Sequence, residues 1–140
     1  MANDISDRCN AIEECYEFSL AYAAQGLPAD HRSNTGAQVR TYLNRAVEAL
    51  TGLAGAYADT IKDLGLEPAK RYEAFIAVIE RDANDSLAAI ELVLAQPSIS
   101  SQLIDNLNAS IHLRALLTDL FLIDEVLKLY VSPASSVVTS

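Results

Sequence analysis

Apolar residues recur at alternating steps of four and three along most of this 140-residue chain. The clearest example lies in residues 36–64, where the repeating positions are Val39, Leu43, Ala46, Leu50, Leu53, Tyr57, Thr60 and Leu64. This spacing puts the side chains on one face of an α-helix, and it is typical of helices that pack nearly parallel or antiparallel to one another. The pattern therefore predicts an all-α protein without strands.

Glycine and proline divide the pattern into four blocks, and each block predicts one long helix. The expected helices cover about residues 4–25, 36–64, 68–95 and 100–130. Gly26, Gly65 and Pro97 separate them. Because the two later connections are short, consecutive helices there must be antiparallel neighbours. We expect an up-down antiparallel four-helix bundle of long helices, with residues 1–131 as a single domain and residues 132–140 as a C-terminal tail.

Two glycines interrupt the second block. Gly52 and Gly55 lie inside the expected helix, where each costs about 1 kcal/mol relative to alanine. Either the helix breaks there, or the backbone of a neighbouring helix approaches it closely. Ala49 and Ala56 continue the series of small residues, so we favour the close approach.

The fourth block is the most apolar part of the chain, and on one continuous helix its apolar residues form two stripes. The first stripe is Ala109, Leu113, Leu116, Leu120, Ile123, Leu127 and Tyr130. The second stripe is Ile104, Leu107, Ile111, Ala115, Leu122, Val126 and Leu129, interrupted by Thr118. One stripe is enough to close a four-helix bundle, so the other predicts contact with a further surface.

That further surface belongs to a second copy of the chain, to a different protein or to the chain's own tail. Symmetric pairing is the commonest arrangement of soluble oligomers, so we expect a homodimer or a dimer of dimers. The first stripe has the spacing of a continuous seam, which makes it our choice for the intermolecular contact. The expected interface residues are Leu113, Leu116, Leu120, Ile123, Leu127 and Tyr130.

The net charge of −9 restricts the classes of partner. Nucleic-acid affinity depends on Lys and Arg displacing counterions from phosphates, and no expected helix is basic enough for an anionic membrane surface. We expect neither nucleic acid nor membrane as a partner. An acidic stripe on the first helix either faces solvent or docks a basic protein. It consists of Asp7, Glu13, Glu14 and Glu17.

The sequence also bears on location. Asp4 and Asp7 occupy the region where a secretory signal would be positively charged. The apolar segment 111–130 contains five charged residues and falls short of a membrane span. We therefore expect a cytoplasmic protein in which Cys9 and Cys15 are partly buried thiols, since six residues along a helix place them too far apart for a disulfide.

We find no motif for catalysis, a metal or a cofactor. A di-iron bundle would contain Glu-x-x-His pairs, and neither of the two histidines, His31 and His112, belongs to such a pair. Haem attachment and phosphate-binding loops need motifs that the sequence also lacks. We expect no catalytic residue, no metal ligand and no cofactor, and the balance favours a protein that is not an enzyme.

The function favoured by these features is a non-enzymatic helical interaction module, a small self-associating regulator or adaptor. An alternative is a bundle that binds a small apolar ligand between its helices, lined by tyrosines. The tyrosines in question are Tyr16, Tyr22, Tyr42, Tyr57 and Tyr72. A position at the edge of the core, with solvated hydroxyl groups, explains them equally well.

The segment SIHLRALLT around His112 resembles the phosphorylated box of histidine kinase dimerisation helices, in which a helical His is followed closely by Leu, Arg and Thr. It departs from that box in two ways. The His is one residue nearer to Arg114 than the box requires, and Leu113 replaces the expected acidic residue. The resemblance implies a further alternative, a phosphotransfer bundle that uses His112, whereas the simpler interpretation is a polar residue at the edge of a helix.

Overall fold

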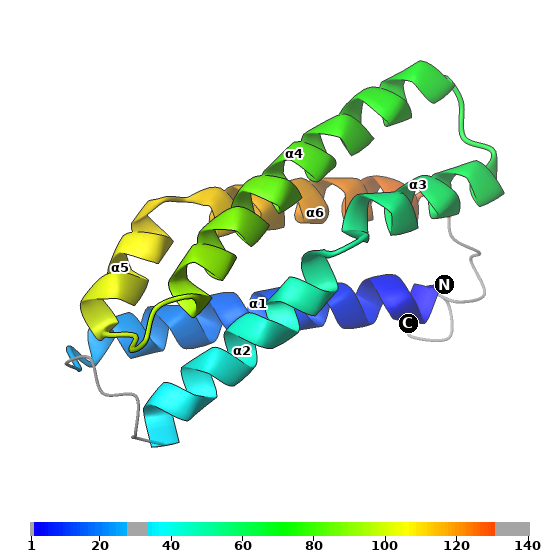
Figure 1. Cartoon of the computed structure of the whole chain (residues 1–140). Coiled ribbons are helices and arrows are strands. Elements are labelled where there is room, and N and C mark those ends of the chain that lie inside the picture. Colours follow the sequence, from blue (N-terminus) through cyan, green and yellow to red (C-terminus); the bar gives the residue numbers. More distant parts are fainter. Residues whose placement is uncertain (1, 28–33, 131–140) are drawn as a thin grey trace.

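The structure is a computed structural model, and it describes residues 2–27 and 34–130. These residues form six helices and no strand, which confirms the predicted all-α class (Figure 1). The helices are α1 (Ala2–Ala24), α2 (Asn34–Leu50), α3 (Leu53–Leu64), α4 (Ala69–Leu94), α5 (Ser101–Ala109) and α6 (His112–Lys128). The expected tail and His31 lie outside the described residues. The four long helices of the prediction become six because the second and fourth blocks each break once.

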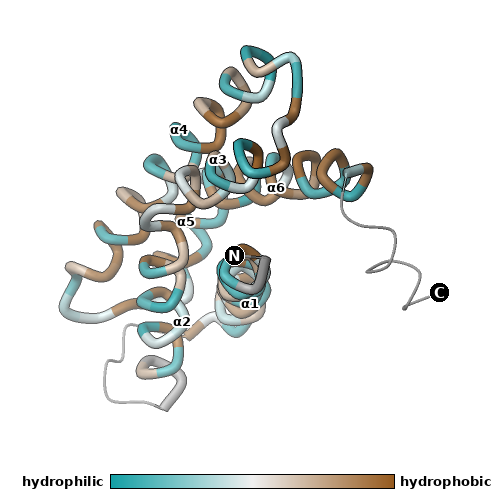
Figure 2. Tube along the Cα trace, turned by 90° about the vertical axis from the view of Figure 1, so that its right-hand side faces the viewer, coloured by the Kyte–Doolittle hydropathy of each residue, from teal (hydrophilic) through white to brown (hydrophobic). Residues whose placement is uncertain are grey.

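The helices enclose one apolar core. α2 and α5 pack against α1, while α4 packs against α2, α3 and α6 (Figures 1 and 2). The core is built from the four-three positions that the sequence marks, including the fully buried Ile12, Leu43, Leu53, Ile79 and Leu116. Cys9 and Cys15 are free thiols and are buried more deeply than the partial burial we expected. No helix in the described ranges has the length and apolar character needed to cross a bilayer.

The second block breaks at Gly52, which adopts a left-handed conformation with φ of 82°. Glycine reaches this region without the steric cost that other residues meet, so α2 ends at Leu50 and α3 begins at Leu53. The preferred interpretation, a close backbone approach, is wrong. A Cβ added at Gly55 would meet no atom within 4 Å, and one at Gly52 would meet only the side chain of Arg8.

The fourth block breaks at Ile111, which has φ of 61°. α5 ends at Ala109 and α6 begins at His112, although no glycine or proline marks the junction. A β-branched residue in the left-handed region is strained, and the side chain of Ile111 is exposed. The expected continuous helix over residues 100–130 is therefore wrong, and the two apolar stripes do not run along a single helix.

The packing of α6 also overturns the expected interface. Leu113, Leu116, Leu120, Ile123 and Leu127 lie inside the chain's own core, each at most 8% exposed, where α6 packs against α4 and α1. Tyr130, the sixth residue of the expected interface, is 48% exposed. The five buried side chains are not available to a second protein. Their regular spacing marks the seam within the chain, not a seam between two chains.

Candidate interaction surfaces

The exposed apolar side chains gather on one stretch of the chain. Among the described residues, eight large hydrophobic side chains are exposed, and five of them lie between Ile111 and Tyr130. On α6 itself the exposed ones are Phe121 and Leu122, and Leu129 directly follows the helix. Leu122 and Leu129 belong to the second predicted stripe, whereas Ile104 of the same stripe is buried in α5. The exposed apolar surface of this stretch is therefore centred on Phe121, Leu122 and Leu129, and it lies beside exposed polar residues of α6, namely Arg114, Thr118, Glu125 and Lys128.

A hollow lies on each side of this face. The hollow toward α4 is about 260 Å³ and is lined by Arg71, Tyr72, Phe75, Leu122, Ile123 and Val126. The groove toward α1 is about 320 Å³ and is lined by Glu13, Tyr16, Glu17, Arg114, Leu117, Thr118 and Phe121. Figure 2 looks along α1 and shows α6 projecting to the right of it. Phe121 thus lines the groove on the side of α1 and Leu122 the hollow on the side of α4, and the exposed Arg114, Thr118 and Glu125 lie on the outward face between them.

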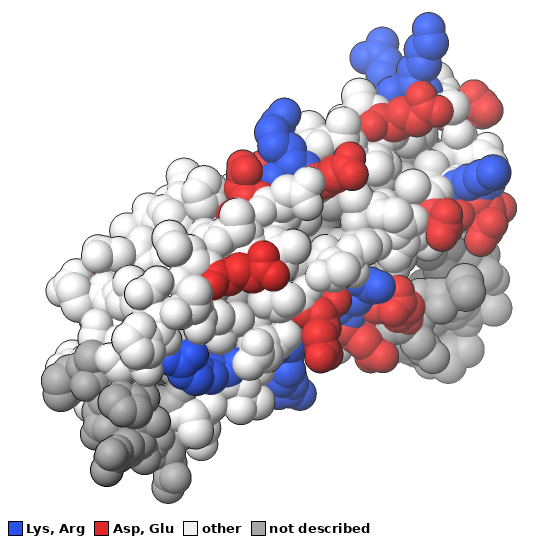
Figure 3. All heavy atoms as spheres, in the orientation of Figure 1, with Lys and Arg blue, Asp and Glu red and all other residues white. Residues whose placement is uncertain are grey.

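The predicted acidic stripe lies on the surface of α1 as expected for a solvated helix face. Asp7, Glu14 and Glu17 are exposed and Glu13 is half-buried. Glu13 and Glu17 form part of the groove between α1 and α6, and Glu14 lies 4.0 Å from the guanidinium of Arg45. On the face shown in Figure 3, acidic and basic side chains intermingle toward the end where α3 meets α4.

The five predicted ligand-lining tyrosines are dispersed and do not share one cavity. Tyr22 is buried, and its hydroxyl donates a hydrogen bond to the backbone oxygen of Ile99 at 2.6 Å. Tyr57 is also buried, and its hydroxyl donates to Asp124 Oδ1 at 2.8 Å. These two rings pack in the core, and their hydroxyl groups form hydrogen bonds with other groups of the protein.

The other three tyrosines lie nearer the surface. Tyr42 stacks on Phe18 with ring centroids 4.5 Å apart, and Tyr16 lines the groove between α1 and α6. Tyr72 borders a hollow of about 550 Å³ between α3 and α4, together with Ile61 and Ile76. No other tyrosine of the five lines that hollow. The structure gives no single tyrosine-lined ligand site among the described residues.

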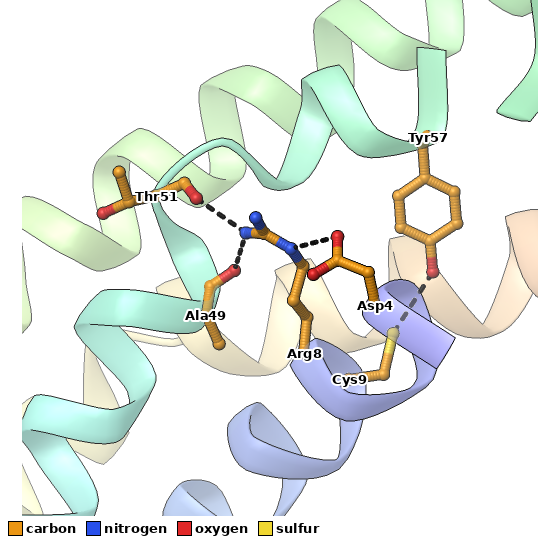
Figure 4. Close-up of polar contacts among 6 residues, drawn as sticks. All are labelled: Asp4, Arg8, Cys9, Ala49, Thr51 and Tyr57. Carbon is orange, nitrogen blue, oxygen red and sulfur yellow. Dashed lines mark hydrogen bonds and ion pairs between the residues drawn. The ribbon is translucent and has the colours of Figure 1, made fainter. Parts of the chain in front are cut away.

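A polar cluster joins α1 to the break between α2 and α3 (Figure 4). Arg8 Nη1 donates to the backbone oxygens of Ala49 at 2.9 Å and Thr51 at 2.6 Å, which are carbonyls left without helical partners at the end of α2. Arg8 Nε donates to Asp4 Oδ2 at 2.8 Å. Sequence reasoning missed this role because the contact joins positions 41 and 43 residues apart.

The cysteine thiols are held in their protonated form. Cys9 Sγ lies 3.2 Å from the hydroxyl of Tyr57, and burial raises the pKa of Cys9 to about 11. Burial likewise raises the pKa of Cys15 to about 11. Because the thiolate is the reactive species, both side chains are poor nucleophiles near neutral pH. Their role in the described structure is to fill the core.

A buried carboxyl group lies between α4 and α6. Burial, reinforced by the neighbouring carboxyl of Asp82, raises the pKa of Asp119 to about 7. Asp119 Oδ2 is buried without a hydrogen-bond partner in the described part of the chain, and so is the hydroxyl of Ser86, one turn beyond Asp82 on α4. Arg81 partly offsets the effect on Asp119. Among the described residues, the only other buried side-chain polar atom without a hydrogen-bond partner is Ser19 Oγ on α1.

His112 is the first residue of α6, directly after the break at Ile111, and its side chain is half-buried. The resemblance to a phosphorylated helix implies a histidine with helix on both sides, which this position does not provide. In residues 2–27 and 34–130, no three His, Cys, Asp or Glu side chains are placed to hold a metal ion.

Comparison with known proteins gives no relative. No family model matches the chain, and no curated protein or solved structure matches it significantly. The surfaces of α6 and α1 are therefore the basis on which a function can be proposed.

Proposed function

We propose that the chain is a non-enzymatic helical interaction module that pairs with a second copy of itself through the outward face of α6. The supporting observation is that Leu122 of α6 and Leu129, which directly follows it, are 55% and 76% exposed, while the opposite face of the helix is already buried. Burying such side chains is favourable by about 25 cal/mol for each Å² of apolar surface removed from water. Leu122 and Leu129 are two helical turns apart on the same side of the helix, and exposed apolar patches on folded domains commonly mark binding sites.

A second copy is the partner that fits one such face most simply, because a twofold axis lets the same residues serve both subunits. α6 has 17 residues and is about 25 Å long. A stable interface buries more than about 1,000 Å² in total, so residues on the walls of the two flanking hollows would extend the contact. We place the module in the cytoplasm, where thiols such as those of Cys9 and Cys15 stay reduced.

The test is the mass of the protein in solution, measured by light scattering. The wild-type chain should have the mass of a dimer at micromolar concentration. Leu122→Asp should halve that mass and keep the helical circular dichroism, because dissociation leaves the new charge in water. Leu92→Asp is the matched control, since Leu92 of α4 is 67% exposed and lies away from the proposed face.

A monomeric wild-type protein would contradict the proposal. Equal dissociation of the Leu92→Asp protein would show that the effect of an added charge is not specific to α6.

A further inference from the structure

The groove between α1 and α6 has an apolar floor and an acidic wall. Tyr16 of α1 and Leu117 and Phe121 of α6 supply apolar surface. Glu13 and Glu17, one helical turn apart on α1, supply the acidic wall. The groove thus offers apolar burial and negative charge side by side, which are the two features that an amphipathic basic helix requires.

No ion pair within the described part of the chain neutralises the acidic wall. Neither Glu13 nor Glu17 forms an ion pair with a described residue, and the one cationic side chain in the groove, Arg114 of α6, forms none with them. Asp7 and Glu14 lie on the same helix, and the whole chain has a net charge of −9. The field at the groove therefore favours a cationic ligand.

A second copy of this chain does not supply that charge. α2 is the described helix with more basic than acidic side chains, and its arginines already contact other groups. Arg40 donates to the backbone oxygens of Leu94 at 3.1 Å and Gln96 at 2.6 Å, and Arg45 lies near Glu14.

The exposed Lys70 and Arg71 at the start of α4 stand beside the exposed Glu67 and Glu73, so that segment brings no net positive charge. The complementary partner is therefore a different protein.

We propose that the groove between α1 and α6 binds a basic amphipathic helix of another protein. An apolar side chain of that helix enters between Tyr16 and Phe121 and covers Leu117. Its Lys or Arg side chains pair with Glu13 and Glu17 at the rim. The apolar anchor provides most of the affinity, whereas the charges set orientation, association rate and salt dependence.

The probe for this proposal is a fluorescein-labelled model helix of leucine and lysine at helical spacing, and binding is measured by fluorescence anisotropy. The same peptide with glutamate in place of lysine should not bind. The double variant Glu13→Gln/Glu17→Gln should weaken binding of the lysine peptide by about tenfold or more. Phe121→Ser, at a side chain that is 53% exposed, should weaken it to a similar degree without unfolding the protein, because it removes the apolar anchor and adds no charge.

The matched control is Asp59→Asn/Asp63→Asn on α3. These two exposed acids have the same spacing as Glu13 and Glu17, and their replacement changes the net charge by the same amount. The control should leave the affinity within about twofold of wild type. An equal loss in both double variants, binding of the glutamate peptide or no binding of the lysine peptide would overturn the proposal.

The proposed dimer and the proposed groove can be tested separately. Leu122 lines the hollow on the α4 side of α6 and not the groove. The Leu122→Asp protein should therefore bind the lysine peptide at least as tightly as wild type, whether or not the wild type is a dimer. A loss of peptide affinity in this variant would contradict the assignment of the groove.

Discussion

Asp119 shows how a single side chain can make the stability of this fold depend on pH. Its pKa, raised to about 7 by burial and by Asp82, exceeds the ordinary value of a carboxyl group, so the folded state holds the proton more tightly than the unfolded state. The stabilising contribution is complete below the ordinary carboxyl range and is lost as the pH rises through about 7. The protein should be less stable in mildly alkaline than in mildly acidic solution.

The variant Asp119→Asn should remove this loss, because the amide has the same shape and no charge to ionise. Urea unfolding at about pH 5 and pH 8 would compare the free energies of unfolding. Wild type should lose stability between the two values, and the variant should lose clearly less. Asp105→Asn, at an exposed position on α5, is the control and should behave as wild type. An unchanged pH dependence in the Asp119→Asn protein would show that this carboxyl is ionised in the fold.

At the scale of helices, the two breaks make opposite predictions for glycine and alanine. Ile111 is exposed and has a left-handed backbone, where a residue with Cβ costs about 1 to 2 kcal/mol. Ile111→Gly should therefore stabilise the protein by about 0.5 to 1 kcal/mol after the added entropy of the unfolded chain. Gly52→Ala should destabilise it by about 1 kcal/mol or more, because alanine is strained at this φ.

These two variants distinguish six helices from four. In an uninterrupted helix, Ile111→Gly would cost about 1 kcal/mol and Gly52→Ala would gain about as much, so both signs would reverse. Thermal or urea unfolding of the two variants gives the answer directly. A stabilised Gly52→Ala protein together with a destabilised Ile111→Gly protein would instead support the long, uninterrupted helices that the apolar spacing predicts.

Local sequence predicts the helices well where the chain marks their ends. α1 and α4 begin and end within two residues of the predicted positions, because Gly26, Pro68 and Pro97 act through local backbone geometry. Gly52 also indicated a possible helix break, although we favoured a close approach of a neighbouring backbone at that position. The sequence around Ile111 did not predict a helix break, because no glycine or proline occurs there. The break lies where α5 and α6 pack against different neighbours in the core.

The candidate surfaces were only partly predictable for a similar reason. Periodicity identified two apolar stripes in the last block, but it cannot tell which one faces the chain's own core. That choice depends on where α4 and α1 lie in space, and the structure assigns Leu116 and Leu120 to the core and Leu122 to the surface. The acidic residues of α1 were found from sequence, whereas the groove beside Glu13 and Glu17 depends on the divergence of two helices distant in sequence.

For the whole molecule, the net charge of −9 means that two copies repel each other over their entire surfaces. The proposed dimer contact relies on apolar side chains, so added ions do not strengthen it directly. Salt does screen the repulsion between the two acidic copies, with a Debye length of about 10 Å at 0.1 M. Raising the salt concentration from about 0.05 to 0.5 M should therefore tighten the dimer, as measured by sedimentation equilibrium. Binding of the lysine peptide should weaken over the same range, because it depends on attraction to Glu13 and Glu17. A dimer that dissociates with salt would instead be held together by ion pairs, and the outward face of α6 would not be its interface.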